Sequence, residues 1–295
     1  MPPKDIPALN GRTIRCLLFD VGETLWTRQD DAKWDAVAHA GNLRALTLLR
    51  QHCNSPIPAN TDETLLGQQL RTAIDKHARN MIIQTPYREP NGVAAVGTAL
   101  AELDLPAVDT ELAAAIFEAM RMRIPESRAL FEDCLATLAE LQRRGFLLGV
   151  VTNRMHGSAA FLEDMRLMGL LDYFAVPHIA VSADLGIRKP APEIFLYVLN
   201  ALGVPPQEAA MVGDGLRTDV AGAQQLGTFS IWIPQRRVQT NTLTGARYVS
   251  DDQLLAQVRH HEGQKYAQML SDIKPDLIIA RLSDLLDIFV KAGSP

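Results

Sequence analysis

The chain has 295 residues, with 29 Lys and Arg against 34 Asp and Glu, a formal charge of -5. This balance and the lack of any basic run argue against a nucleic-acid partner. No stretch approaches the roughly 20 apolar residues of a membrane helix, and Met1 to Asn10 do not read as a secretory signal. The three cysteines share no metal spacing. We therefore expect a cytoplasmic protein without a membrane or nucleic-acid partner, either a monomer or a homodimer.

The first expected element is an apolar strand at Thr13–Phe19, which leads directly into Asp20. A strand without polar alternation suits a parallel sheet that is covered on both faces. Ligands of open α/β sheets bind at the carboxyl ends of the strands. At that position the carboxylate of Asp20 can act as a nucleophile, a metal ligand or both.

Residues 26–128 differ in composition from the first strand, because they are rich in Ala, Leu, Gln and Arg. This composition predicts a mainly helical module inserted after the first strand. Apolar residues recur at helical spacing between Trp34 and Leu49. The expected helices are Asp31–Gln51, Thr61–Ile83, Ala94–Leu103 and Asp109–Met122. The domain prediction is thus a core of residues 1–25 and 129–295, interrupted by a helical module of residues 26–128.

From residue 129 onward, strands alternate with helices, which predicts a doubly wound parallel sheet of the α/β class. The expected strands are Phe146–Val151, Phe174–Val181, Ala209–Gly213, Phe229–Ile233 and Leu277–Ile279. The expected helices are Glu132–Arg144, Ser158–Met168, Ala191–Leu202, Asp219–Leu226 and Ser283–Lys291. The connection after Pro234 is long for a structureless loop, so added helical structure is expected at about residues 235–275.

Polar residues follow several of these strands, and in a parallel sheet they would converge at one edge. The set suits phosphoryl transfer, in which Asp20 attacks phosphorus and forms an aspartyl-phosphate. A Mg²⁺ ion needs oxygen ligands, which Asp20, Asp214 and the backbone carbonyl near Gly22 can supply. Asp219 would either bind the metal directly or orient a bound water.

The remaining candidates would bind the phosphate group of the substrate and offset its charge. Lys189 would keep Asp20 ionised and offset charge on the transferring group. Thr152 would donate its hydroxyl to a phosphate oxygen, although it could also cap the next helix. Thr24, Asn153 and Arg28 are candidate substrate contacts, with a solvated surface position as the alternative for Arg28.

In order and residue type, these segments resemble the four motifs of the haloacid dehalogenase-like (HAD) superfamily, and the resemblance covers nearly the whole chain. The corresponding segments are Phe19–Thr24, Val150–Asn153, Arg188–Phe195 and Gly213–Asp219. The resemblance implies a Rossmann-like HAD core with an inserted helical cap similar to the C1 type. It also implies a Mg²⁺-dependent phosphatase that acts on a small phosphorylated metabolite, since most members of this type are such enzymes.

The chain departs from the family at Gly22, where the family has a second Asp. That Asp protonates the leaving oxygen and then activates water, help that is typically worth ~10²–10⁴-fold in rate. Glu23, a residue of the helical module or the acidity of the leaving group could take its place. Two alternatives stay open. One is a 2-haloacid dehalogenase, which needs no metal and has no use for Asp214 and Asp219. The other is a binding or regulatory protein that has lost turnover.

Overall fold

The computed structural model describes Leu9, residues 11–28 and 30–52, Ile57, residues 61–234, Gln268 and residues 272–290. The chain divides into two compact units. We call one the sheet unit; it comprises Met1–Thr27, Leu130–Asn153 and Met165–Pro295. The other, the helical unit, comprises Arg28–Ala129 and Arg154–Asp164, of which the second segment was not part of the predicted module. The helical structure predicted at about residues 235–275 falls almost entirely outside the described residues.

The sheet unit is built on a six-stranded, fully parallel sheet in the order β5-β4-β1-β6-β7-β8. Its strands are β1 (Cys16–Phe19), β4 (Leu147–Thr152), β5 (Ile179–Val181), β6 (Ala209–Gly213), β7 (Phe229–Trp232) and β8 (Leu277–Ile278). The chain starts in the middle, builds β4 and β5 on one side of β1, and then returns to add β6, β7 and β8 on the other. This arrangement confirms the predicted doubly wound sheet and places its switch point between β1 and β6.

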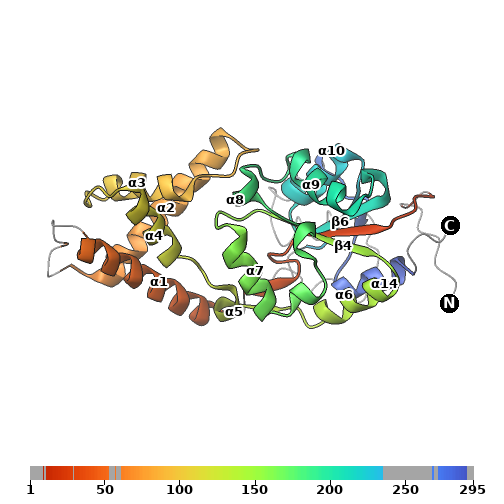
Figure 1. Cartoon of the computed structure of the whole chain (residues 1–295), viewed down its shortest axis with the longest axis horizontal. Coiled ribbons are helices and arrows are strands. Elements are labelled where there is room, and N and C mark those ends of the chain that lie inside the picture. The colour runs from red at the N-terminus through yellow and green to blue at the C-terminus, as the bar shows by residue number, and fades with distance from the viewer. Residues whose placement is uncertain are drawn as a thin grey trace. The chain divides into compact units, whose positions relative to one another are not determined.

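Helices cover both faces of the sheet. Figure 1 shows α9 and α10 on one side of the strands and α6 and α14 on the other. The α-helices of this unit include α6 (Cys134–Arg143), α8 (Ser182–Leu185), α9 (Pro192–Leu202), α10 (Ala221–Leu226) and α14 (Leu285–Ile288). Helix α9 buries Ile194, Phe195, Val198 and Leu199 against β1, β4 and β6 residues, which explains the apolar spacing read from the sequence. Burial on both faces likewise explains why all four residues of β1 are apolar and inaccessible to solvent.

The helical unit is a bundle with its own apolar core (Figure 1). Its helices are α1 (Asp31–His52), α2 (Glu63–Gln84), α3 (Gly92–Glu102), α4 (Thr110–Ala119) and α5 (Ile124–Ser127), and α7 (Ser158–Leu167) begins in this unit. Asp62, Asn91 and Asp109 cap α2, α3 and α4, each accepting a hydrogen bond from a backbone N–H of the first turn. The described helices include none that is long and apolar enough to cross a lipid bilayer.

Several boundaries differ from the predictions. The strand predicted at Phe174–Val181 is only Ile179–Val181, because Pro177 lies in a 3₁₀ turn at Val176–His178 and has no N–H for a sheet ladder. The helix predicted from Asp219 begins earlier, with a wide π-helical turn at Leu216–Val220. The predicted C-terminal helix is divided into a 3₁₀ turn at Leu282–Asp284 and α14.

Two short strands were not predicted. They are β2 (Trp26–Arg28) and β3 (Arg128–Leu130), which form a two-stranded sheet. The chain passes between the two units at these strands. Three residues each are too few to produce a recognisable alternation of apolar and polar side chains, so the sequence pattern carried no signal for them.

Candidate active site

Three charged side chains from distant parts of the sheet unit meet at the switch point of the sheet. The ammonium Nζ of Lys189 lies 2.6 Å from Oδ1 of Asp20 and 2.6 Å from Oδ1 of Asp219. Asp20 follows β1, and its backbone N–H donates to the carbonyl of Val212 in β6, at 2.9 Å. Lys189 and Asp219 are 2% and 1% exposed, whereas Asp20 is 9% exposed. Asp20 is therefore the member of this cluster that a ligand can reach most easily.

Burial and the neighbouring charges have opposite effects on the pKa values of Lys189 and Asp219. Burial disfavours the ammonium of Lys189, but the carboxylates of Asp20 and Asp219 outweigh it and hold the pKa of Lys189 above its usual value. For Asp219, burial is the largest influence and raises its pKa to about 6, although the Lys189 ammonium acts in the opposite direction. Lys189 is thus cationic at neutral pH and lowers the energy of negative charge on the adjacent oxygens.

The carboxylates of Asp20, Asp214 and Asp219 could hold a metal ion. Each offers one oxygen, and these oxygens lie within 4.8 Å of one another. Three carboxylates beside one lysine leave an excess of negative charge, which a hard divalent cation such as Mg²⁺ would offset. Asp214 is half-buried at the end of β6, and its backbone carbonyl accepts a hydrogen bond from Trp232 Nε1 at 2.8 Å. This bond fixes the backbone while leaving the carboxylate in the cluster.

Gly213 and Gly215 have no Cβ, and the side chains of Asp219 and Thr218 occupy the space where one would lie. A Cβ on Gly213 would lie 2.3 Å from Oδ2 of Asp219, and a Cβ on Gly215 would lie 2.0 Å from Oγ1 of Thr218. The backbone N–H of Gly215 also donates to Oδ2 of Asp219, at 2.8 Å. The prediction assigned roles to Asp214 and Asp219 but none to these glycines. Their spacing on either side of Asp214 was the signal that could have revealed them.

Asn153 was predicted as a substrate contact, but its side-chain amide is bound to the backbone of Lys189. The N–H of Lys189 donates to Oδ1 of Asn153 at 2.8 Å, and Nδ2 of Asn153 donates to the Lys189 carbonyl at 3.1 Å. The same residue therefore fixes the segment that carries the lysine. Thr152, the last residue of β4, is 3% exposed and directly precedes it.

The turn after Asp20 contains the other predicted residues. Gly22 has an ordinary φ and no heavy atom within 4 Å of the position of a Cβ, so a side chain would fit there. Glu23 has a φ of 55°, in the left-handed region that favours glycine, and its Oε2 accepts a hydrogen bond from Thr27 Oγ1 at 2.7 Å. Thr24, predicted to bind substrate, is fully buried. Its hydroxyl has no hydrogen-bond partner among the described residues, and its contact with a substrate stays a prediction.

Arg28, the third predicted substrate contact, belongs to the helical unit and is engaged there. Its guanidinium lies 3.2 Å from Asp31 and 3.6 Å from Asp35, and 4.6 Å from the ring centroid of Trp34. These contacts within the helical unit account for its position without a ligand.

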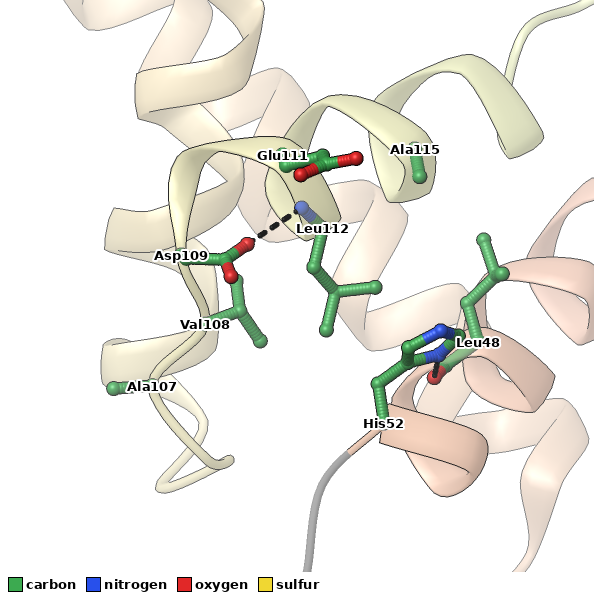
Figure 2. Close-up of a pocket in the computed structure, with 8 residues that line it drawn as sticks. All are labelled: Leu48, His52, Ala107, Val108, Asp109, Glu111, Leu112 and Ala115. Atoms are coloured by element: carbon green, nitrogen blue, oxygen red, sulfur yellow. Dashed lines mark hydrogen bonds between the residues drawn. The ribbon is translucent and has the colours of Figure 1, made fainter.

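A cavity of about 510 Å³ in the helical unit lies between the end of α1 and the start of α4 (Figure 2). Two of its polar side chains have structural partners. Asp109 accepts from the N–H of Leu112 at 2.8 Å and so caps α4, and the ring of His52 is bonded to the carbonyl of Leu48 at 3.0 Å. The described residues that line this cavity form no set of groups comparable with the cluster around Asp20.

Comparison with known proteins points to one family. A phosphoserine phosphatase of Thermus thermophilus is 39% identical over 125 residues, which are 42% of this chain and 46% of that protein. The chain thus matches less than half the length of this relative. A HAD phosphatase of Thermococcus onnurineus has a TM-score of 0.56 at 23% identity, with 95% of this chain and all of that one covered. A 2-haloacid dehalogenase of Pseudomonas syringae has a TM-score of 0.54 at 24% identity, with 94% and 98% covered.

The two structural matches are below 25% identity and therefore establish the fold alone. The family match extends over most of the chain. Residues 14–227 match the haloacid dehalogenase-like hydrolase family, and residues 186–285 match a second, HAD-hydrolase-like description. The first match contains Asp20, Thr152, Lys189, Asp214 and Asp219. The chain therefore belongs to the haloacid dehalogenase-like hydrolase family.

Proposed function

We propose that this protein is a Mg²⁺-dependent phosphohydrolase that cleaves a small phosphorylated metabolite through an aspartyl-phosphate on Asp20. The observation that carries the proposal is the position of Asp20 at the sheet switch point, 2.6 Å from the Lys189 ammonium and within 4.8 Å of the Asp214 and Asp219 carboxylates. A carboxylate beside one buried cation and two further carboxylates is a set that suits phosphoryl transfer to an aspartate.

In the first step, a carboxylate oxygen of Asp20 attacks phosphorus and the bond from phosphorus to the ester oxygen breaks. The leaving oxygen takes up a proton from water, and Asp20 carries the phosphoryl group. In the second step, a water oxygen attacks phosphorus and gives up a proton, the bond from phosphorus to Asp20 breaks, and inorganic phosphate leaves the restored carboxylate. Lys189 forms an ion pair with the attacking carboxylate and lowers the energy of the charge that develops on the phosphoryl oxygens. Thr152, at the end of β4, would donate its hydroxyl to a phosphoryl oxygen.

The oxygens of Asp20, Asp214 and Asp219 suit a Mg²⁺ ion, with the Gly22 carbonyl as a further candidate ligand. When bound, Mg²⁺ supplies positive charge that offsets the charge of the phosphate group and of the carboxylates. Asp219 is the most buried of the three and is already bonded to Lys189 and to the Gly215 N–H. It would therefore act mainly by orienting its neighbours.

The name of the Thermus relative, a phosphoserine phosphatase, supports phosphatase chemistry. The proposal also takes the helical unit as the family's cap and the sheet unit as its core, in a cytoplasmic protein that is a monomer or homodimer. Specificity for one metabolite would then depend on the helical unit.

A second candidate, a 2-haloacid dehalogenase, is favoured by Gly22. This position has no carboxylate to protonate a leaving oxygen, and a halide leaves without a proton. The acidic cluster favours the phosphohydrolase, because dehalogenation by an aspartate requires no metal. Halide release from 2-haloacids that is unaffected by EDTA would reverse this ranking.

The test is phosphate release from a panel of phosphorylated metabolites, with and without Mg²⁺, by the full chain and by its Asp20→Asn variant. Asp172→Asn, an exposed residue of the same unit, is the matched control. We expect activity that needs Mg²⁺, is lost in Asp20→Asn and is kept in Asp172→Asn. Equal activity of Asp20→Asn and the unaltered protein would rule out Asp20 as the nucleophile. Phosphate binding without release from any ester would indicate a binding protein instead.

A further inference from the structure

Trp232 is the last residue of β7, and its backbone is held on both sides within the sheet. It pairs with Gly213 of β6, whose carbonyl accepts a hydrogen bond from the N–H of Ile233 at 3.0 Å. On the other side, the carbonyl of Trp232 accepts a hydrogen bond from the N–H of Ile279, also at 3.0 Å. The residue is buried, with 3% of its surface exposed. Its indole ring is therefore attached to a well-fixed part of the sheet.

The indole of Trp232 and the carboxylate of Asp219 bind the same peptide group, one at its carbonyl and the other at its N–H. Nε1 of Trp232 donates to the carbonyl of Asp214 at 2.8 Å. The N–H of Gly215, in the same peptide group as that carbonyl, donates to Oδ2 of Asp219 at 2.8 Å. This peptide group is trans and planar, so its C=O and N–H point in opposite directions. By holding the carbonyl, Trp232 therefore directs the N–H towards Asp219.

Gly215 allows this peptide group to rotate, and the hydrogen bond from Trp232 opposes that rotation. Rotation changes ψ of Asp214 and φ of Gly215 together. Gly215 has a φ of -89°, but a glycine adopts positive φ about as readily as negative φ. A rotated group would turn its carbonyl oxygen towards the carboxylate of Asp219, which would lose a donor and gain a repulsive neighbour. The indole N–H stabilises the orientation in which Asp219 receives the hydrogen bond.

The two residues that this peptide group connects to the indole are both candidate metal ligands. Asp214 and Asp219 supply two of the three carboxylates whose oxygens lie within 4.8 Å of one another. The side chain of Asp214 leaves the backbone at the Cα next to the peptide group, and Asp219 accepts from its N–H. A change in the orientation of the group would therefore move both carboxylates. Loss of a residue that orients metal ligands typically weakens metal binding by about 10–100-fold.

We propose that Trp232 is a positioning residue for the metal site, whose indole N–H fixes the peptide group between Asp214 and Gly215 and thereby orients the carboxylates of Asp214 and Asp219 for Mg²⁺. The inference rests on the proposed function, because it requires Mg²⁺ to bind these carboxylates. The alternative is that Trp232 only fills the core, since a buried indole N–H usually finds an acceptor. A core-filling role predicts a loss of stability without a change in metal affinity.

The test is calorimetric titration of Mg²⁺ into the full chain and into its Trp232→Phe variant, which keeps an aromatic ring but loses the N–H. We expect the Kd for Mg²⁺ to rise about tenfold or more in Trp232→Phe. Ser230→Ala is the matched control, because Ser230 is buried in the same strand and donates from Oγ to Oδ2 of Asp276 at 2.7 Å. It should lower Tm and leave the Kd for Mg²⁺ unchanged. An unchanged Kd in Trp232→Phe, or an equal rise in both variants, would overturn the inference and leave the proposed function standing.

A second readout needs no substitution of Trp232. The chain has three tryptophans, so the nuclear magnetic resonance spectrum of the ¹⁵N-labelled protein contains three indole N–H signals, and Trp26→Phe and Trp34→Phe identify that of Trp232 by elimination. We expect Mg²⁺ to shift this signal with the Kd found by calorimetry, and Asp214→Asn to reduce the shift. If Trp232→Phe does not fold, this signal decides, and its failure to move at saturating Mg²⁺ would refute the inference alone. If the unaltered chain binds no Mg²⁺, the inference and the metal-dependent function are both wrong.

Discussion

The side-chain amide of Asn153 pairs with the backbone of Lys189 through two hydrogen bonds, although 36 residues separate them in the sequence. The amide takes the place of a neighbouring strand, accepting from the Lys189 N–H and donating to the Lys189 carbonyl. The backbone at Lys189 is thus fixed independently of the ion pairs that its ammonium makes. Asn153 is a positioning residue for the lysine.

Replacing Asn153 with Leu should remove both hydrogen bonds at nearly constant volume. Because each is worth about 1 kcal/mol, we expect the free energy of unfolding to fall by about 2 kcal/mol. If Lys189 shifts as a result, kcat for phosphate release should fall at least tenfold while KM changes much less. Steady-state kinetics and chemical denaturation measure the two effects.

Gln142→Leu is the control for this variant, because Gln142 also donates from its side-chain amide to a backbone carbonyl, that of Tyr173, at 2.9 Å. It should lower stability but leave kcat unchanged. A similar loss of kcat in both variants would mean that Asn153 contributes only to folding.

Gly22→Asp should raise turnover. The position has room for a side chain and an ordinary φ, so the aspartate can be added without backbone strain. A general acid is typically worth ~10²–10⁴-fold, and the gain should be largest for alkyl phosphates, whose leaving oxygens need a proton most. Rates with an alkyl phosphate and with p-nitrophenyl phosphate test this.

Gly22→Asn supplies the same volume without the acid and should give no gain. If Gly22→Asp folds normally and hydrolyses alkyl phosphates no faster than the unaltered chain, then a missing acid does not limit this enzyme.

Mg²⁺ should stabilise the folded protein, because it offsets the repulsion among Asp20, Asp214 and Asp219. At a concentration 100 times its Kd, a ligand that binds only the folded state adds about 2.7 kcal/mol to the free energy of unfolding. Thermal unfolding with Mg²⁺ and with EDTA measures this, and Asp214→Asn should reduce the shift while Asp172→Asn should not. Identical melting curves in Mg²⁺ and EDTA would contradict the metal site.

His156 should make the helical unit less stable in acid. Burial lowers its pKa to about 4 in the folded protein, against 6.5 for an unperturbed histidine, so the unfolded state gains a proton first as the pH falls. The contribution of neutral, buried His156 to the free energy of unfolding is complete above about pH 6.5. It falls by up to about 3 kcal/mol as the pH decreases towards 4. Denaturation across this pH range should show a shallower decline for His156→Gln, and an unaltered decline for His52→Gln, at an exposed histidine of the same unit. Parallel pH profiles for the unaltered protein and His156→Gln would exclude this histidine as the cause.

The sheet could be predicted because its strands are buried on both faces and appear in the sequence as unbroken apolar runs. Since the strands are parallel, residues that follow them meet at one edge, so the sequence alone predicts that Asp20 and Asp214 lie close together. Their catalytic and metal-binding roles remain predictions. The family resemblance, by contrast, is confirmed by the match over residues 14–227.

What the sequence did not reveal depends on contacts without a local pattern. Nothing in the residues around Asn153 indicates that its amide binds a backbone 36 positions away. Likewise, apolar residues on both sides of Pro177 suggested one long strand, although the proline confines pairing to the last three residues. The ion pairs of Arg28 with Asp31 and Asp35 were not predicted either, and its contact with a substrate stays a prediction.

Gly213 and Gly215, which adjoin Asp219, affect how mutagenesis of this site would be interpreted. An alanine scan finds important residues by deleting side-chain atoms, and at most positions a loss of activity indicates a lost contact. At Gly213 and Gly215, alanine adds an atom in space that Asp219 and Thr218 already occupy. A scan that skips glycines would overlook two positions on which the geometry of the acidic cluster depends, and one that includes them would report steric exclusion of the aspartate rather than a missing interaction.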